Sequence, residues 1–203
     1  MNFHRCLAVF LLSLTLAHVS QAEELHDAAT TGDLEKVKTL VNGGADINAK
    51  DKFKNVPICL AARENKKDVV AFLLEKGADI NSKGDIDAPP LYWAAMQGHK
   101  DTVAFLLEKG ADVNARTMFD LTPLHIAAGE GQKEVVALLL EKGADINGKD
   151  KMGVTPLHKA AAENRKEVVA LLVEKGADKT IKDAEGKTPA EKATDEAVKA
   201  LLK

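Results

Sequence analysis

A fixed period of 33 residues runs through this chain and constrains its fold more than any other feature of the sequence. The tripeptide Gly-Ala-Asp returns without a slip at Gly44, Gly77, Gly110, Gly143 and Gly176. Prolines recur in phase with it at 57, 90, 123, 156 and 189, and Ala-Ala pairs recur at 28, 61, 94, 127 and 160. A unit of this size cannot bury its apolar face alone, so the pattern predicts a row of similar units packed side by side.

Each unit is expected to contain two short helices. In the unit around residue 122, the Thr122 hydroxyl can accept from free backbone amides at a helix start, and Pro123 occupies the first helical position, where no N–H is needed. Gly131 ends this helix, and 134–142 forms a second one with a broad apolar stripe. Gly143 is suited to the left-handed residue that ends a helix. The polar stretch that follows, such as 145–154, predicts a projecting hairpin.

The stretches Thr-Pro-Leu-His-Ile-Ala-Ala at 122–128 and Thr-Pro-Leu-His-Lys-Ala-Ala at 155–161 closely resemble the ankyrin repeat signature. Each is followed within its unit by Glu-Lys-Gly-Ala-Asp, and the resemblance covers essentially all of 23–203. It implies an all-α fold, an ankyrin-repeat solenoid of stacked helix-turn-helix units with projecting β-hairpin loops. The usual work of this family is protein recognition.

The two ends of the repeat array differ from its middle, as the ends of a stack must if they are to face water. The first unit begins directly on a helix at Leu25, and the last replaces the usual Leu and His with Ala190 and Glu191 and lacks three residues between its helices. We therefore expect an N-terminal capping repeat at 23–50, internal repeats at 51–83, 84–116, 117–149 and 150–182, and a shortened C-terminal capping repeat at 183–203.

Residues 1–22 have the form of a secretory signal peptide. Arg5 supplies the basic start, an apolar run covers 7–17, and Ser20 and Ala22 are small residues placed before Glu23. The apolar run is too short to span a bilayer, although an uncleaved anchor is the alternative. Cleavage would leave a periplasmic or secreted protein with no stable membrane insertion, which we expect to be a monomer.

Charge and composition argue against several classes of partner. Removing 1–22 deletes one Arg and no acid, so the formal charge changes from −3 to −4, which gives no reason to expect nucleic acid or an anionic membrane. Cys59 is then the only cysteine, so no internal disulfide can form. A buried, inert thiol is the favoured interpretation of Cys59, and an intermolecular bridge is the alternative.

No grouping of residues indicates catalysis or a bound cofactor. The sequence lacks Gly-x-Ser-x-Gly, a phosphate-binding glycine loop and His-Glu-x-x-His. His26, His125 and His158 share one position of the repeat, which places them in a row at about 8–10 Å per unit, too far apart to bind one metal ion. We interpret them as structural hydrogen-bonding residues in a protein that is not an enzyme.

Two internal repeats depart from the pattern. Val56 and Pro89 replace the capping threonine, so each of these units loses a helix cap that contributes about 1 kcal/mol of stability. The early repeats should therefore be less stable than the later ones. Tyr92 and Trp93 replace a His or Cys and an aliphatic residue. We expect Trp93 to lie in the core and the polar tip of Tyr92 to reach the concave face.

The expected hairpin tips carry apolar residues in loops that are otherwise polar. By resemblance to the family, these tips and the exposed side of the first helix of each unit form the contact surface, and an exposed apolar stripe usually marks an interface. The alternative is that neighbouring tips pack on one another along the stack. The predicted partner-binding residues are Phe53, Ile86, Tyr92, Met96, Met118, Phe119, Leu121, Met152 and Val154.

We therefore predict a non-catalytic module that binds a protein partner outside the cytoplasm. The alternative from another class is an enzyme or a small-ligand receptor, which would use a pocket near Tyr92 and Trp93. An accessory or effector protein of an enzyme belongs to the same alternative. A purely structural or host-directed secreted role is a third alternative, which the location of the mature protein would test.

Overall fold

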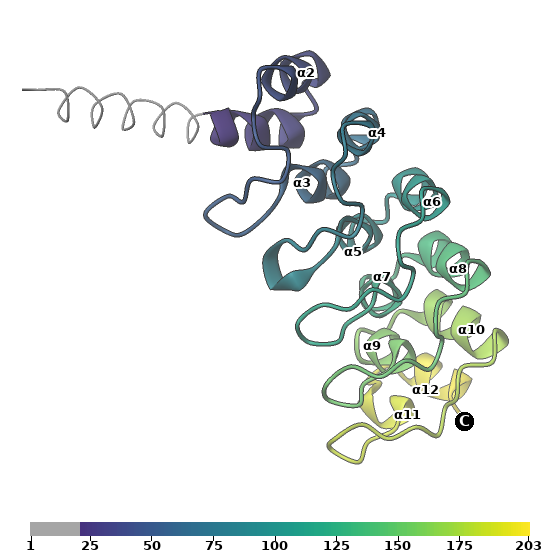
Figure 1. The fold of residues 1–203 in the computed structure, drawn as a ribbon. Coiled ribbons are helices and arrows are strands. Elements are labelled where there is room, and N and C mark those ends of the chain that lie inside the picture. Colours follow the sequence, from purple (N-terminus) through teal and green to yellow (C-terminus); the bar gives the residue numbers. More distant parts are fainter. Residues whose placement is uncertain (1–20) are drawn as a thin grey trace, which may run out of the picture.

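A computed structural model describes residues 21–203, which form an elongated, curved stack of paired helices with loops projecting along one side (Figure 1). The described residues contain helices, turns and loops, and no β-strand is assigned among them. The predicted all-α solenoid is thereby confirmed, and its projecting loops are closed by turns. Except for Gln21 and Ala22, the predicted signal peptide lies outside the described residues.

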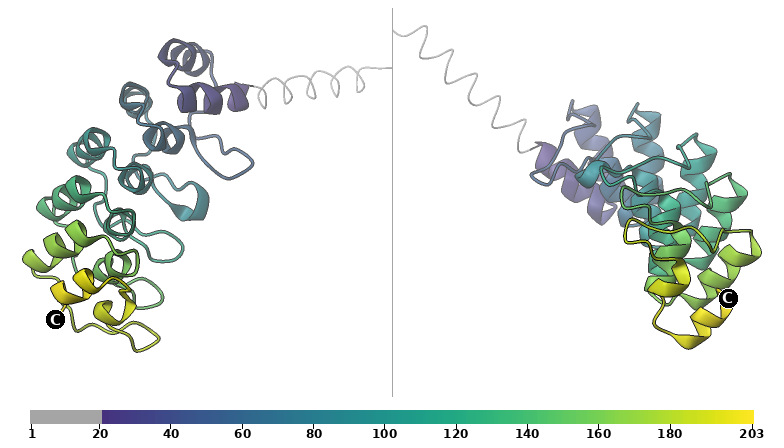
Figure 2. Two further views of the ribbon diagram at one scale, coloured as in Figure 1. Left: turned by 180° about the vertical axis from the view of Figure 1, so that it is seen from behind. Right: turned by 90° about the horizontal axis from the view of Figure 1, so that it is seen from below.

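The helices form an inner and an outer row, which are seen side by side in Figure 1 and from two further directions in Figure 2. Each inner helix from α3 onward packs against the next inner helix, and each outer helix packs against the next outer one. The inner row consists of the helix at 21–31, α3 (Pro57–Arg63), α5 (Pro90–Met96), α7 (Pro123–Glu130), α9 (Pro156–Ala162) and α11 (Pro189–Lys192). The outer row consists of α2 (Leu34–Asn42), α4 (Lys67–Glu75), α6 (Lys100–Glu108), α8 (Lys133–Glu141), α10 (Lys166–Glu174) and α12 (Glu196–Leu201), and one loop contains the short 3₁₀ helix η1 (Asp85–Asp87).

One continuous core follows the stack, because every unit buries the same positions. The Ala-Ala pairs of α3, α5, α7 and α9 are fully buried, and their small side chains let neighbouring inner helices approach closely. The outer helices contribute a leucine at one shared position, and all four leucines have no exposed surface: Leu73, Leu106, Leu139 and Leu172. None of the helices within 21–203 has both the length and the apolar character to cross a membrane.

The first residues of the inner helices confirm the prediction of which helices have a side-chain cap and which lack one. In α7, the His125 N–H donates to Thr122 Oγ1 (3.4 Å) and the Thr122 N–H donates to His125 Nδ1 (3.2 Å). Thr155 and His158 repeat both contacts in α9. Val56 and Pro89 precede α3 and α5 with the same extended backbone but make no side-chain cap.

The last unit is short, as expected from its sequence. Helix α11 has four residues where α9 has seven. Asn164, at the end of the preceding unit, holds the segment between α11 and α12, because its Oδ1 accepts from the backbone N–H of Thr194 (3.1 Å) and of Asp195 (2.8 Å). Asp195 then caps α12. The exact unit boundaries remain predictions.

Candidate recognition surface: loop tips and inner helices

In most of the projecting loops, an aspartate at the same repeat position fixes the turn. Asp51 Oδ1 accepts from the backbone N–H of Phe53 and of Asn55, both at 2.8 Å. Asp150 does the same for Met152 (2.8 Å) and Val154 (2.9 Å). These turns satisfy the loop amides internally and fix the backbone, so the residue two places after the aspartate stands at the tip.

The tip side chains are exposed, as the sequence predicts. Phe53 is 61 % exposed, Met152 57 %, and Met118 and Phe119 49 % each. Neighbouring tips are joined by their backbones: the Met118 N–H donates to Ile86 O (2.9 Å), the Lys151 N–H to Phe119 O (3.2 Å) and the Ala184 N–H to Met152 O (2.8 Å). Neighbouring tips therefore contact one another through their backbones, as the alternative predicts, while these four side chains remain exposed. We call Met118, Phe119 and Met152 the apolar ridge.

The sequence predicts that Ile86 and Phe53 belong to the same surface as this ridge. In the structure, neither is part of the ridge. Gly84 stands where the other loops have Asp or Thr, so this loop lacks the side-chain acceptor and forms η1 instead. Ile86 adopts a left-handed backbone with φ of 50° and is half-buried. Phe53, Ile86 and Met118 together line a hollow of about 430 Å³.

Tyr92 and Trp93 exchange the roles that the sequence predicts for them. Tyr92 is buried, with 3 % of its surface exposed, and this burial raises its pKa to about 12, so it does not present a polar tip to a partner. Trp93 is only half-buried and lines a cavity. The reason is helical geometry: Tyr92 shares the repeat position of the buried His125, whereas Trp93 is rotated by about 100° towards the concave side.

The remaining predicted residues lie at the base of the ridge. Met96 at the end of α5 is half-buried, as are Leu121 and Val154, which close their loops just before α7 and α9. The Thr117 N–H donates to Leu121 O and the Asp150 N–H to Val154 O, both at 3.0 Å. These residues support the tips and offer only part of their surface to a partner.

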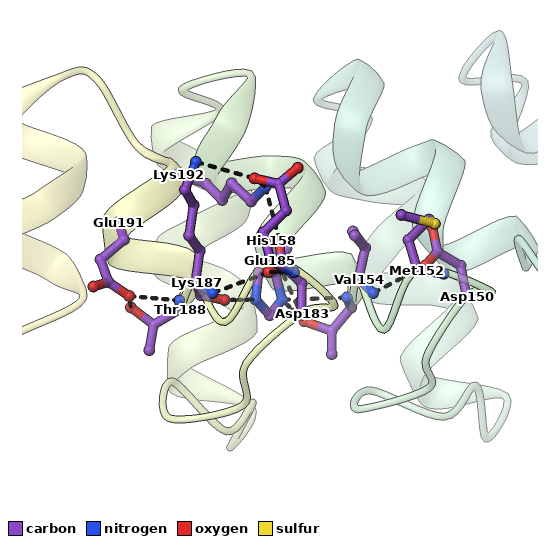
Figure 3. A network of polar contacts seen from close by, with 11 residues as sticks. Asp150, Met152, Val154, His158, Asp183, Glu185, Lys187, Thr188, Glu191 and Lys192 are labelled. Atoms are coloured by element: carbon purple, nitrogen blue, oxygen red, sulfur yellow. Dashed lines mark hydrogen bonds and ion pairs between the residues drawn. The ribbon is translucent and has the colours of Figure 1, made fainter.

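His125 and His158 each join their own unit to the loop of the next unit by a hydrogen bond. Because Nδ1 of His125 accepts from a backbone N–H, its proton is on Nε2, which donates to Val154 O (3.0 Å). The same holds for His158, whose Nε2 donates to Lys187 O (3.1 Å) (Figure 3). Burial lowers the pKa of His125 to about 4 and also lowers the pKa of His158. This confirms the structural role predicted for His125 and His158. The residues 21–203 contain no group of three or more His, Cys, Asp or Glu arranged to hold a metal ion.

Beside His158, a lysine of the last unit secures the final loop (Figure 3). Lys192 Nζ lies 2.7 Å from Asp183 Oδ2 and 3.1 Å from Glu185 Oε2. The hydrogen bond from Lys192 is the main cause that lowers the pKa of Asp183 to about 2. Asp183 also accepts from the backbone N–H of Glu185 and of Lys187, so the loop that receives the His158 bond is held at both ends.

Cys59 takes the histidine position in the first internal repeat. Its Sγ lies 3.7 Å from both Ser82 O and Ala88 O, so it makes only weak contacts to the next loop. Burial raises the pKa of the Cys59 thiol to about 12, and the side chain is 1 % exposed. The thiol is therefore unreactive in the folded protein, as the favoured interpretation predicted, and its burial argues against an intermolecular bridge.

A cavity of about 460 Å³ on the concave side of the first units lies at Trp93, where the alternative function required a pocket, but sequence reasoning missed its acidic lining, and Tyr92 is not part of it. Its lining includes Asp27 and Glu23 of the first helix together with Arg63 and Trp93. The four-residue spacing of Glu23 and Asp27, which puts both on one helix face, was the available signal. Their proximity to Trp93 is a tertiary contact that no local pattern carries.

The stacked helix pairs and their row of projecting loops define a helical repeat protein that presents an extended surface. Residues 25–117 and 116–183 match the family model of ankyrin repeats (3 copies), and the chain belongs to this family. It is also similar to protein phosphatase 1 regulatory subunit 27 of Homo sapiens and of Mus musculus, each 37 % identical over 62 residues, which is 30 % of this chain. The matched stretch spans 40 % of the length of each relative.

Proposed function

We propose that this protein binds a protein partner outside the cytoplasm, without catalysing a reaction, through the apolar ridge and the concave face of its inner helices. Membership of the ankyrin repeat family supports protein binding. The similarity to proteins named as regulatory subunits of a phosphatase is in keeping with a protein that acts by binding another protein.

The exposure of the apolar ridge carries this proposal. Met118, Phe119 and Met152 are the large apolar side chains that face water on adjoining loops, where polar residues would otherwise be expected. Hydrogen bonds inside each loop and between neighbouring loops hold their backbones. A partner therefore meets a preformed surface, and little ordering entropy is lost when it binds.

The surroundings of the ridge have the composition of an interface. Glu130 and Glu163, at the ends of the neighbouring inner helices, are exposed, and Leu121 and Val154 add half-buried apolar surface beneath the tips. A central apolar group with a charged border is the usual arrangement of a specific protein interface. The partner should accordingly present an apolar patch of its own to Phe119 and Met152.

The experiment compares capture of the native partner by the wild type and by the double variant Phe119→Glu/Met152→Glu. We expect the Kd of the captured partner to rise at least about 100-fold, because charges would occupy two central apolar positions. The charge-matched control, Ala170→Glu/Ala200→Glu, alters exposed alanines of the outer helices α10 and α12 and should bind normally. Leucine at both ridge positions should also retain binding. Unchanged capture by the Glu double variant, with helical content intact, would refute the ridge.

Export is a separate part of the proposal and has its own test. It is supported by the basic start, apolar run and small residues of 1–22. Fractionation of the native cell, with N-terminal sequencing of the mature chain, should find the protein outside the cytoplasm and beginning at Glu23. A cytoplasmic protein that retains residues 1–22 would contradict export, but it would not affect the proposal that the ridge binds a partner.

A further inference from the structure

The cavity on the concave side of the first units is lined by five separate parts of the chain. The helix at 21–31 provides one wall and the loop that contains Phe53 provides another. The rest of the lining comes from α3 with Arg63, η1 with Asp85 and α5 with Trp93. Its volume of about 460 Å³ is large enough for a long side chain together with a short stretch of backbone. It lies at the opposite end of the molecule from the last units, on the side that the loops border.

The lining of the cavity carries an excess of negative charge. Four carboxylates line it, against the positive charges of Lys52 and Arg63 and, after the proposed cleavage, the α-amino group of Glu23. Glu23 and Asp27 are one helical turn apart, and within 21–203 neither of their carboxylates makes an ion pair or a side-chain hydrogen bond. The other two, Asp51 and Asp85, each accept from loop N–H groups and still contribute charge. Low-dielectric walls strengthen such a field inside a cleft.

Aromatic rings complete the lining. Phe53 and Trp93 both border the cavity, and the Arg63 guanidinium lies 5.9 Å from the centre of the Trp93 ring. Arg63 is paired through Nε with Glu64 (3.1 Å), so it is not the counter-ion of Glu23 or Asp27. The Trp93 Nε1 atom is buried and has no hydrogen-bond partner within 21–203, so one donor of a residue that lines the cavity is without an acceptor.

Resting on the proposed function, we propose that this cavity receives a lysine or arginine side chain from the protein partner. The cationic group meets Glu23 and Asp27, and its aliphatic stem packs on Phe53 and Trp93. A small rotation of the indole lets Trp93 Nε1 donate to an oxygen of the partner backbone. An acidic segment is disfavoured, because it would meet the carboxylates of Glu23 and Asp27.

The chain has a single tryptophan, so its fluorescence reports on this cavity directly. The full chain is titrated with blocked hexalysine and, separately, with blocked hexaglutamate, at about 50 mM salt, where charge interactions are weakly screened. We expect hexalysine to change the Trp93 emission saturably and hexaglutamate to leave it unchanged. In Glu23→Gln/Asp27→Asn, the Kd for hexalysine should rise at least about tenfold.

The matched control is Glu134→Gln/Glu141→Gln, which neutralises two exposed carboxylates on the outer helix α8 and should bind hexalysine as the wild type does. Calorimetry of Trp93→Phe, which keeps a ring but removes the N–H, should show a weaker Kd by a factor of about three or more. Equal binding of hexaglutamate, an equal loss in the α8 control, or no loss in Glu23→Gln/Asp27→Asn would overturn the proposal.

The experiments distinguish a wrong cavity proposal from a wrong ridge proposal. Phe119→Glu/Met152→Glu should lose the native partner but titrate normally with hexalysine. If hexalysine binding fails while ridge variants still abolish partner capture, the cavity proposal is wrong and the proposed function stands. If hexalysine binds as expected but ridge variants capture the partner normally, the proposed ridge is wrong.

Discussion

The two internal repeats at 51–116 and the two at 117–182 follow the same backbone path but differ in how well their polar groups are satisfied. In the later pair, Thr122 and Thr155 cap their inner helices and the histidines bond to the next loop. In the earlier pair, Val56 and Pro89 provide no cap. The two buried side-chain polar atoms without a partner within 21–203, Ser82 Oγ and Trp93 Nε1, also lie in the earlier pair.

The difference shows how units that share one repeat pattern and one backbone path can differ in stability. A missing cap costs about 1 kcal/mol, and an unsatisfied buried polar atom about 1–3 kcal/mol. In natural proteins such local conflicts concentrate at functional sites, and here one of them, Trp93 Nε1, belongs to a residue that lines the cavity. Because the stability of a repeat stack is close to a sum over units and their interfaces, the earlier pair should open first.

The largest expected effect comes from removing core volume in each half. Leu73→Ala and Leu139→Ala delete fully buried side chains at one repeat position, and each should lower the free energy of unfolding by about 4 kcal/mol. Hydrogen exchange should show Leu73→Ala losing protection in 21–116 only, whereas Leu139→Ala should lose it throughout, because the weaker half depends on its neighbour. Identical exchange patterns in both variants would show that the halves do not differ.

Acidification should weaken the later repeats selectively. The folded pKa of His125, about 4, is below its ordinary value of 6.5, so between these values the unfolded chain binds more protons. Stability is therefore full above about pH 6.5 and falls by roughly 3 kcal/mol as the pH approaches 4. Denaturant unfolding across this range measures the loss, which His125→Gln/His158→Gln should largely remove. The same pH dependence in the double variant would contradict this origin.

Cysteine and tyrosine occupy the histidine position in the earlier repeats, so this position should contribute no pH dependence to their stability in that window. The pKa values of Cys59 and Tyr92 are both raised to about 12, so neither group titrates between pH 4 and 7. Residue-resolved exchange protection of 51–116, after correction for intrinsic rates, should stay constant there until the later half unfolds. If exchange protection in 51–116 fell at a higher pH than protection in 117–182, the earlier repeats would be the more acid-sensitive half, contrary to this prediction.

Restoring the caps should reduce the difference between the halves. Val56→Thr and Pro89→Thr place a hydroxyl at the start of α3 and α5, where the backbone is already extended, and each should stabilise the protein by up to about 1 kcal/mol. Thr122→Val is the reciprocal control and should destabilise by a similar amount. Urea unfolding measures these values, and a destabilised Pro89→Thr would show that proline rigidity outweighs the cap there.

The smallest effect concerns Cys59, whose thiol should react only when the earlier repeats open. At 1 % exposure it should resist alkylation at pH 8 in the folded protein. Its labelling rate, followed by mass spectrometry of the peptide that contains it, should increase in Leu73→Ala by more than in a variant of α10 such as Leu172→Ala. Rapid labelling of the wild type would contradict the burial.

Much of the fold could be predicted from the sequence because its rules are local. Proline at the first helical position, the alanine pairs and the glycine stops recur every 33 residues, and they place α3 to α10 and the lost caps at Val56 and Pro89. The exposure of Phe53, Met118, Phe119 and Met152 followed from the same reasoning, since turn residues keep their loops at the surface.

The sequence by itself determined the period, the helices and the stack, because each depends on residues within one unit. The tertiary structure alone decided that Tyr92 is buried while Trp93 faces the cavity, and that Ile86 leaves the ridge. Those outcomes depend on what the neighbouring unit places opposite a side chain. Asp27 and Trp93 are two units apart, and only stacking brings both to one cavity.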